Sequence, residues 1–594
     1  MAPFASLWTG IASNYPIFIP PDDAEGGLFS CEYPSMVGWK SCNTKTNRSC
    51  WLSGPNNETY DIYTDYETKG PKGVIREYYL EVQETMLNPD GIKVPWGLTF
   101  NGTYPGPRLR ACWGDQLRIT VSNTLSLNNT NSNGTTIHWH GLRQWNTGWS
   151  DGVNGVTQCP IAPTDTFTYV FNATQYGTTW YHSHYSLQYA NGLLAPLTIY
   201  GPSSKNYSEQ KYPLIMTDWN HDRSGMKYLL RLINAATATT YVFSIDNHKF
   251  WVIEADFVPI EPYQTDHIVV GIGQRYNIIV EAIPEKVSPG ESYWIRTTPA
   301  LLCNIFPDPK PDSTTGIVRY SLSDEIPTTQ MGNFTADCID ETYTRNLTPI
   351  VHWQVKGLTY DLPIFNVSFQ EIKGYPYWPC NESVGRLELI QGHPLWLNFS
   401  NATLLNLNAN YSQRPWLAEV TTPSLSETWV KAIIMTESTK ENPTLPRPLP
   451  DTPGLFAPRM HPMHLHGHDF ALLAQCVPES QNSTNCDLSK AVLNLDNPPR
   501  RDVAFLPDGG YLIIAFKADN PGVWLLHCHI AFHASSGLAL QIIENKENIK
   551  MPDSVTTSLY QMCQNWNSWK PDNASDPCMC AHPGVEPLQQ DSGI

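Results

Sequence analysis

Histidines gathered at four places are the residues of this chain most able to do chemistry. Ten of the seventeen histidines stand in four clusters around a single cysteine. The clusters are His138-Trp139-His140, His182-Ser183-His184, His461-Pro462-Met463-His464-Leu465-His466, and His527-Cys528-His529 followed by His533. Side chains on a strand alternate between its two faces, so each His-x-His puts two imidazoles on one face. The sequence therefore predicts several metal ions held mainly by imidazole.

Cys528 lies between two of these histidines, so on a strand its thiolate points to the opposite face. Imidazole suits copper, zinc, iron and nickel alike, but two histidines and a cysteine with a weak axial neighbour form the blue-copper electron-transfer geometry. We therefore expect copper in two kinds of site linked by Cys528. His468 continues the alternation of the third cluster and is a candidate neighbour of the metal. No metal is expected at His221, His248, His267, His352, His393 or His582.

The four clusters, in this order, resemble the copper signatures of the multicopper oxidases, and more narrowly of fungal laccases of the ascomycete type. The likeness continues through Gly155–Pro160, Tyr181–His184, Asn497–Asp502 and Asp591–Ile594, and covers most of the chain from about Cys42. It implies one type 1, one type 2 and two type 3 copper ions. By position, the resemblance assigns His461, Cys528 and His533 to the type 1 copper, and His138 and His464 to the type 2 copper. It assigns His140, His182 and His529 to one type 3 copper, and His184, His466 and His527 to the other.

The same resemblance implies a reaction. A phenol gives single electrons to the type 1 copper, with His461 or His533 as the edge nearest the substrate, and the Cys528 backbone carries them to His527 and His529. Four such electrons reduce dioxygen to water. Asp151, in Trp149-Ser150-Asp151-Gly152, matches the family's acid beside the histidine cluster and would relay protons, although an Asp-Gly pair is by default a turn.

Leu538 stands ten positions after Cys528, where the family places the axial neighbour of the type 1 copper. Leucine cannot coordinate, so the cupric state is less well supported and we expect a medium-to-high potential. The alternative is that Leu538 is simply a core residue, and both statements can hold together.

Ala238 occupies the position at which laccases commonly place a carboxylate that accepts the phenol's proton. Alanine cannot accept a proton, so we expect slower turnover of simple phenols, or a substrate that is easily oxidised or already deprotonated. Phe532, just before His533, and Phe470 are candidates for an aromatic pocket wall, with core packing favoured for Phe470. Coupling of polycyclic phenols in pigment or secondary-metabolite pathways therefore stands beside lignin breakdown as the expected role.

Three alternatives remain open at this point. A ferroxidase would share every copper ligand, but it needs acidic residues around the type 1 histidines and often has a membrane anchor. Ascorbate oxidase is less favoured because Asn497–Asp502 and the last residues look laccase-like. A copper-binding cupredoxin protein without turnover is the third, since the second domain is short of residues.

Composition and pattern predict an all-β protein. Short runs at 116–121, 167–171 and 511–516 lie between Gly, Pro and Asn turns, and 49 prolines disfavour long helices. The resemblance implies three cupredoxin-like Greek-key domains, which we place at residues 59–205, 206–345 and 346–594 after an N-terminal segment 1–58. The first and third would each supply half of the histidine cluster. The second is shortened near 220–227, where the family has a few dozen more residues.

Several features favour a secreted glycoprotein, although Met1–Pro21 lacks the basic start of a signal peptide. Roughly sixteen Asn-x-Ser/Thr sequons, among them Asn101, Asn133, Asn172 and Asn398, accompany fourteen cysteines. No run of about eighteen apolar residues predicts a membrane span. A net charge of −18 without a basic tract disfavours nucleic acid. We expect a monomer whose partners are a small phenol and dioxygen.

The resemblance also pairs cysteines and gives the last residues a role. It implies the disulfides Cys42–Cys50, Cys159–Cys563 and Cys303–Cys338, and Cys476 with Cys486 could close a loop, whereas the partners of Cys31, Cys112, Cys380, Cys578 and Cys580 are left open. Asp591, Ser592, Gly593 and Ile594 resemble the plug that ascomycete laccases insert into the channel leading to the type 3 coppers.

Overall fold

The structure is a computed structural model. It describes residues 29–87, 94–125, 134–210, 213–216, 227–281, 292–300, 303, 314–319, 326–334, 338–339, 341, 347–372, 385–390, 395, 397–409, 416–422, 428–436, 447–449, 452–457, 460–478, 486–535 and 537–569. The predicted C-terminal plug, Asn133, and Cys380, Cys578 and Cys580 lie outside these residues.

The N-terminal strands form three sheets. Alternation along Gln116–Asn123 buries Leu117, Ile119 and Val121 against Trp139 and its neighbours in one apolar core, as a half-buried strand should. In spatial order the sheets are β1 (Lys40–Ser41), β2 (Cys50–Ser53) and β3 (Thr59–Asp61); β5 (Val94–Phe100), β4 (Ile75–Leu87), β7 (Gln116–Asn123) and β9 (Thr166–Asn172); and β6 (Leu109–Cys112), β11 (Leu194–Tyr200), β10 (Gly177–Ser183) and β8 (Ile137–Trp139).

The middle strands form two sheets around a second apolar core. One runs β12 (Glu209–Gln210), β14 (Lys227–Asn234), β19 (Arg275–Glu281), β16 (Phe250–Ala255) and β17 (Val258–Thr265), with β13 (Leu214–Met216) also paired to β14; the other runs β18 (His267–Val270), β15 (Tyr241–Ile245), β20 (Ser292–Pro299) and β21 (Thr314–Arg319). The predicted shortage of strands near 220–227 falls almost wholly on 217–226, which lie outside the described residues, so it stays a prediction.

The C-terminal strands form two large sheets and a hairpin. The first is β24 (Gly385–Ile390), β23 (Phe365–Ile372), β26 (Trp429–Thr436), β33 (Tyr511–Lys517), β30 (Phe470–Cys476) and β31 (Arg500–Arg501), with β22 (Leu358–Asp361) on β26; the second is β25 (Leu417–Val420), β35 (Ala539–Glu544), β34 (Gly522–Cys528), β29 (Met460–Leu465) and β32 (Val503–Pro507). The hairpin is β27 (Arg447–Leu449) and β28 (Thr452–Ala457). Two α-helices are described, α1 (Ala531–Ser535) and α2 (Asp553–Trp569).

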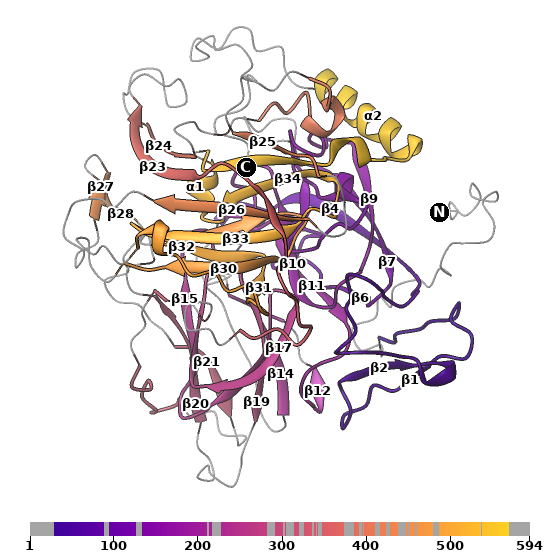
Figure 1. The fold of residues 1–594 in the computed structure, drawn as a ribbon, viewed down its shortest axis with the longest axis vertical. Helices are drawn as coiled ribbons and strands as arrows, with labels where there is room; N and C mark the ends of the chain where they lie inside the picture. The colour runs from indigo at the N-terminus through magenta and orange to yellow at the C-terminus, as the bar shows by residue number, and fades with distance from the viewer. Residues whose placement is uncertain are drawn as a thin grey trace.

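The all-β prediction is confirmed. The runs predicted at 116–121, 167–171 and 511–516 are strands β7, β9 and β33, and Figure 1 shows stacked sheets with α2 as the one long described helix. The middle strands β14 to β21 lie at one end of the molecule, and the strands that carry the histidines, β8, β10, β29 and β34, belong to the N-terminal and C-terminal groups. None of the described helices is long and apolar enough to cross a membrane. The domain boundaries themselves stay predictions.

Five disulfides fasten the described chain. Three match the pairs that the resemblance implied, namely Cys42–Cys50, Cys159–Cys563 and Cys303–Cys338. The other two had been left open: Cys476–Cys486, which closes a loop as considered possible, and Cys31–Cys112. Cys159–Cys563 ties α2 to the N-terminal part of the chain. Cys528 is the one cysteine among the described residues that forms no disulfide, and it is buried.

Candidate metal centre

Two antiparallel strand pairs position the histidines. In the N-terminal part β8 pairs with β10, so that His138 lies opposite His182. In the C-terminal part β29 pairs with β34, so that His464 lies opposite His527. The second histidine of each motif, two residues on, follows on the same side. Each strand pair therefore presents four imidazoles as a group.

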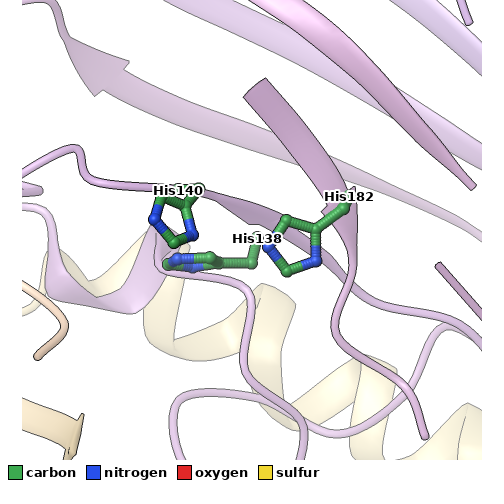
Figure 2. A group of neighbouring side chains, drawn as sticks. All are labelled: His138, His140 and His182. Atoms are coloured by element: carbon green, nitrogen blue, oxygen red, sulfur yellow. The ribbon is translucent and has the colours of Figure 1, made fainter. Parts of the chain in front are cut away.

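The two groups of imidazoles meet in the interior. His138 and His466 have ring centroids 4.1 Å apart, and so do His140 and His464, although each pair joins segments more than 300 residues apart in the chain. Figure 2 shows His138, His140 and His182 turned toward one another. The potential ligand atoms approach within 4.8 Å of one another in several triplets: His138, His140 and His182; His138, His464 and His466; and His184, His466 and His527. All of these histidines are buried.

One nitrogen of most of these rings is anchored, which leaves the other for a metal. The Nδ1 atoms of His138, His182, His464 and His527 lie 2.8–2.9 Å from the main-chain oxygens of Asp151, Ser183, Asp502 and Cys528. A carbonyl can only accept, so Nδ1 carries the proton and Nε2 keeps its lone pair. Those four Nε2 atoms are buried and have no hydrogen-bond partner in the described structure. Buried unpaired imidazole nitrogens that converge, with their outer nitrogens anchored, fit a metal cluster.

Burial keeps these imidazoles in the form that binds metal. It lowers the pKa of His527 to about 4. Burial, reinforced by the neighbouring histidines, also holds the pKa values of six further rings well below the ordinary value: His140, His182, His184, His464, His466 and His529. Because only the neutral ring offers a lone pair, the cluster is ready for cations at neutral pH.

A second site lies on the opposite face of β34. The Cys528 sulfur is 3.5 Å from Nδ1 of His533 and 3.7 Å from Nδ1 of His461, and the two nitrogens are 3.2 Å apart. Leu538 is fully buried in the same apolar cluster as Cys528. A thiolate and two imidazoles in an apolar setting suit copper in its blue electron-transfer form. Leu538 offers this site no donor atom.

Two carboxylates touch the histidine cluster. Asp151 is buried, and its carboxylate lies 2.8 Å from Nδ1 of His466 and 3.4 Å from Nδ1 of His138. Asp502 lies 3.5 Å from Nε2 of His140 and is held by two bonds of 2.5 and 2.7 Å to Arg275. Burial, partly opposed by Arg275, raises the pKa of Asp502 to about 7. The sequence reading singled out Asp151 but gave Asp502 no role, although it quoted the motif that contains it.

The predicted substrate-pocket residues lie around the thiolate site. Ala238 is buried in the same apolar cluster as Leu538, and the carbonyl of Thr237 accepts a 2.9 Å bond from Ala531 of α1, the turn that carries His533. The Phe532 side chain is 41% exposed, whereas Phe470 is fully buried in the core, as the packing interpretation expected. Among the described residues, Phe532 is thus an exposed aromatic side chain directly beside His533.

Four of the seven histidines predicted not to bind metal lie among the described residues. His248, His267 and His352 belong to no triplet of metal-ligating side chains among the described residues, whereas His221, His393 and His582 lie outside them. His468 is buried, and its Nδ1 lies 3.1 Å from the main-chain oxygen of His466 and its Nε2 3.0 Å from Glu544. It therefore lies beside the cluster and faces away from it.

Comparison with known proteins gives one consistent result. Sequence profiles of the multicopper oxidase family match residues 81–204, 173–323 and 403–548. A laccase of Arthroderma benhamiae is 40% identical over 98% of this chain and 95% of its own length. The dihydrogeodin oxidase of Aspergillus terreus is 38% identical, covering 93% and 95%. The crystal structure of a laccase from Botrytis aclada superposes with a TM-score of 0.77 at 37% identity, covering 93% of this chain and all of the other.

Proposed function

The chain belongs to the multicopper oxidase family, and from that membership we propose how its copper ions are held and what it oxidises. It is a laccase-like, copper-dependent oxidoreductase that acts on phenols with dioxygen as acceptor. One observation carries the proposal: two strand pairs bring unpaired imidazole nitrogens together, and the strand that completes the cluster bears the buried thiolate on its other face.

Four copper ions are proposed, divided as the family divides them. His461, Cys528 and His533 would hold the type 1 ion, and their mutual distances of 3.2–3.7 Å support this. His138 and His464 would hold the type 2 ion. The type 3 pair would have one ion on His140, His182 and His529 and the other on His184, His466 and His527. The last set approaches as one triplet, and Nε2 of His529 lies 3.1 Å from Nδ1 of His140.

When bound, copper would supply one-electron redox chemistry at the thiolate site and the four-electron reduction of dioxygen at the histidine cluster. The chain supplies the path and the surroundings. Cys528 is joined covalently to His527 and His529, and its main-chain oxygen also anchors Nδ1 of His527, so the peptide between the sites is short and fixed. Asp151 would hold a proton at the cluster, and its hydrogen bond to His466 supports this role. Burial of the whole cluster excludes bulk water.

The substrate class proposed is a bulky, readily oxidised phenol that undergoes coupling. Ala238 removes the carboxylate that would accept a simple phenol's proton, and the exposed ring of Phe532 next to His533 offers a surface on which a flat aromatic can stack. The name of the Aspergillus terreus relative gives its substrate as dihydrogeodin. Phenol coupling in a pigment or secondary-metabolite pathway is therefore favoured over general lignin turnover. We also propose that the protein is secreted, glycosylated and monomeric.

The test compares substrates in parallel. Purified, copper-loaded protein is mixed anaerobically with a syringol-type phenol, a polycyclic hydroxyquinone precursor, ascorbate or ferrous ion, then exposed to oxygen. We expect the blue colour to bleach and return with both phenols, fastest with the polycyclic one, without hydrogen peroxide. Faster oxidation of ferrous ion or ascorbate would instead favour a ferroxidase or an ascorbate oxidase. Blue colour without oxygen uptake would favour a copper protein without turnover.

A further inference from the structure

The two strand pairs that carry the histidines belong to separate sheets. β8 and β10 lie in the sheet β6-β11-β10-β8, and β29 and β34 lie in the sheet β25-β35-β34-β29-β32. No described strand of one hydrogen-bonds to a strand of the other. Ring nitrogens must nevertheless be held to within a fraction of an ångström to share metal ions. Side chains between the sheets must therefore fix the distance between the two groups of histidines.

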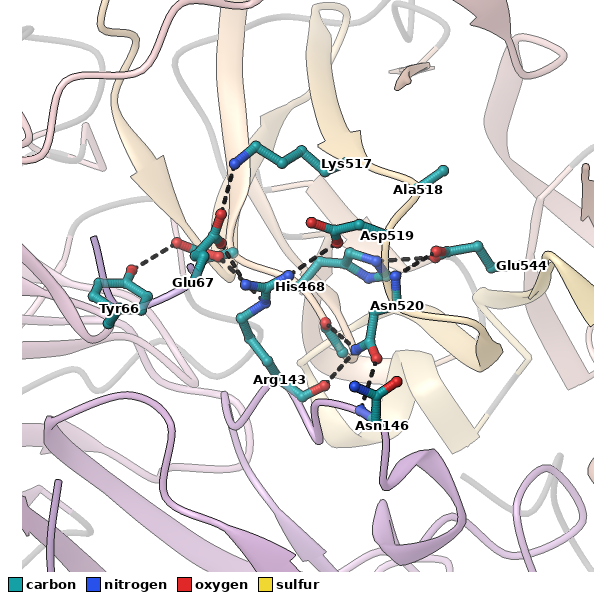
Figure 3. Close-up of polar contacts among 12 residues, drawn as sticks. Tyr66, Glu67, Arg143, Asn146, His468, Lys517, Ala518, Asp519, Asn520 and Glu544 are labelled. Carbon is teal, nitrogen blue, oxygen red and sulfur yellow. Dashed lines mark hydrogen bonds and ion pairs between the residues drawn. The ribbon is translucent and has the colours of Figure 1, made fainter. Parts of the chain in front are cut away.

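Besides the contact of Asp151 with His466, Asn520 makes a buried connection between the histidine-bearing segments. Its amide nitrogen donates to the carbonyl of Arg143 at 2.6 Å and to the carbonyl of Gly467 at 3.0 Å. Arg143 follows His140 by three residues, and Gly467 follows His466 directly. One side-chain amide thus ties the segment after the first histidine motif to the segment after the third. Figure 3 shows Asn520 between Arg143 and Asn146 on one side and Glu544 on the other.

Asn520 is itself held on every side. Its amide oxygen accepts the N–H of Asn146 at 3.3 Å, its main-chain N–H donates to Glu544 at 2.8 Å, and its carbonyl accepts the indole N–H of Trp524 at 2.8 Å. The residue is completely buried. Only an amide presents two N–H groups and one acceptor at that point, since a carboxylate would turn an oxygen toward two carbonyls. An asparagine is therefore required there by geometry.

The boundary between the sheet that holds β8 and β10 and the sheet that holds β29 and β34 is also bridged by the charged side chain of Arg143. Its guanidinium lies 2.6 Å from Glu67, which belongs to the N-terminal part, and 3.0 Å from Asp519, which precedes Asn520. Lys517 lies 2.7 Å from the other oxygen of Glu67. These side chains are buried or nearly so, and Figure 3 shows them as one connected network. Desolvation offsets much of the attraction between such buried charges, so their net contribution to stability is small.

We propose that Asn520, supported by Arg143, is a positioning residue that sets the spacing between the two halves of the histidine cluster, and so the binding and oxygen reactivity of the copper held between them. The inference rests on the proposed copper assignment. Asn520 would act on the cluster through Arg143, Asn146 and Gly467, because none of its hydrogen bonds in the described structure goes to a histidine. Copper that shares His138 and His464 across the boundary should respond first. The thiolate site, built from β29, β34 and α1 on one side of the boundary, should not respond.

The experiment uses the full-length, copper-loaded protein with Asn520→Asp and Asn520→Ser. The control is Asn545→Asp, since Asn545 is also buried and its amide donates to the carbonyl of Ala518 at 3.0 Å, but its partners Ala518 and Thr422 lie on the C-terminal side only. Copper content, the blue absorption, the electron paramagnetic resonance signals of the two mononuclear coppers, and thermal unfolding of copper-free protein are measured for each. Anaerobic bleaching by a phenol and recovery in oxygen are timed separately.

We expect the Asn520 variants to keep the blue band and to bleach within about twofold of the parent rate. Their affinity for the remaining copper should fall about 10- to 100-fold, the usual cost of losing a group that orients metal ligands. Their type 2 signal should be reduced and their recovery in oxygen slowed by a similar factor. Asn545→Asp should lose comparable stability without copper yet keep both copper signals.

The proposal is overturned if the Asn520 variants retain all copper and recover at the parent rate, or if blue and type 2 signals fall together as the protein destabilises. Failure of both Asn520 variants to fold would also overturn it, because Asn520 would then be a general determinant of folding. If the unaltered protein itself shows no cycle of bleaching and recovery, the proposed function fails instead, and the copper content of the variants still decides the role of Asn520.

Discussion

Glu254 should make the stability of this protein depend on pH in a defined direction. Its carboxylate is buried on β16, where one oxygen accepts the N–H of Thr178 on β10, the strand that carries His182. Burial, only partly opposed by the charge of Arg231, raises its pKa from 4.5 to about 7. A carboxyl group with a raised pKa stabilises the fold while it is neutral. That contribution is complete below about pH 4.5 and is lost as the pH rises through 7.

The size of the effect follows from the shift. About 2.5 pKa units correspond to about 3 kcal/mol, at 1.36 kcal/mol per unit. Glu254→Gln removes the titration while keeping an oxygen for Thr178. The variant should therefore match the parent near pH 4.5 and exceed it at pH 8 by about 6–12 °C in the midpoint of thermal unfolding, given about 2–4 °C per kcal/mol for a domain of this size.

The assay is thermal unfolding of both proteins at half-unit steps between pH 4.5 and 8. Glu261→Gln serves as the control, because Glu261 lies on the neighbouring strand β17 with an exposed side chain. A constant difference between Glu254→Gln and the parent across this range would refute the reasoning, since it would mean that Glu254 keeps one protonation state throughout. An equal pH-dependent gain from Glu261→Gln would assign the effect to surface charge instead.

Three further outcomes are expected. Leu538→Met gives the type 1 copper a thioether neighbour that supports the cupric state. The reduction potential should therefore fall by about 60 mV, equivalent to a tenfold change in a one-electron equilibrium. A redox titration of the blue band that shows no fall would contradict this. Ala238→Asp should raise kcat/KM for a simple phenol by about 100-fold above the pKa of the new carboxyl while leaving ferrocyanide oxidation unchanged, and an unchanged ratio of the two substrates would rule out a missing proton acceptor. Removal of copper by a chelator should abolish oxygen uptake and lower the midpoint of thermal unfolding. The free energy of unfolding should fall by about 4 kcal/mol if free copper had been at about 1,000 times its Kd. A midpoint that does not recover when copper is added back would argue against metal bridging the two sheets.

The features that sequence predicted are those with a local or periodic signal. Alternation of apolar residues predicts β7, β9 and β33, and spacing by two predicts that each His-x-His acts as a pair. Helix α2 was not predicted from the sequence, although its residues Leu559, Met562, Cys563 and Trp566 follow the spacing of a helix face and are all buried. That helix had a readable pattern. The disulfide Cys31–Cys112 had none, because its cysteines are 81 residues apart and, unlike Cys159 and Cys563, were not paired by the family resemblance.

The residues that hold the cluster in place could not be found in this way. Asn520 and Arg143 are 377 residues apart, and neither belongs to a motif with a spacing that signals an interaction. A single side-chain amide can bridge two carbonyls only where the fold brings both carbonyls within hydrogen-bond distance of it. That placement depends on the packing of whole sheets. Sequence thus identifies donors of metal-binding atoms, whose chemistry shows in residue type, more readily than the residues that position them.

The position of Cys528 explains why one strand can serve both kinds of site. Alternation on β34 puts its thiolate on the face opposite His527, toward His461 and His533, while its main-chain oxygen stays on hand to anchor Nδ1 of His527. The same residue therefore provides a ligand to one site, orients a ligand of the other, and forms the covalent link between them. Because Cys528 is bonded through the main chain to His527 and His529, the ligands that β34 supplies to the two sites are covalently linked. No such short covalent link fixes the distance from β34 to the histidines of β8 and β10. That distance depends on buried contacts such as those of Asn520.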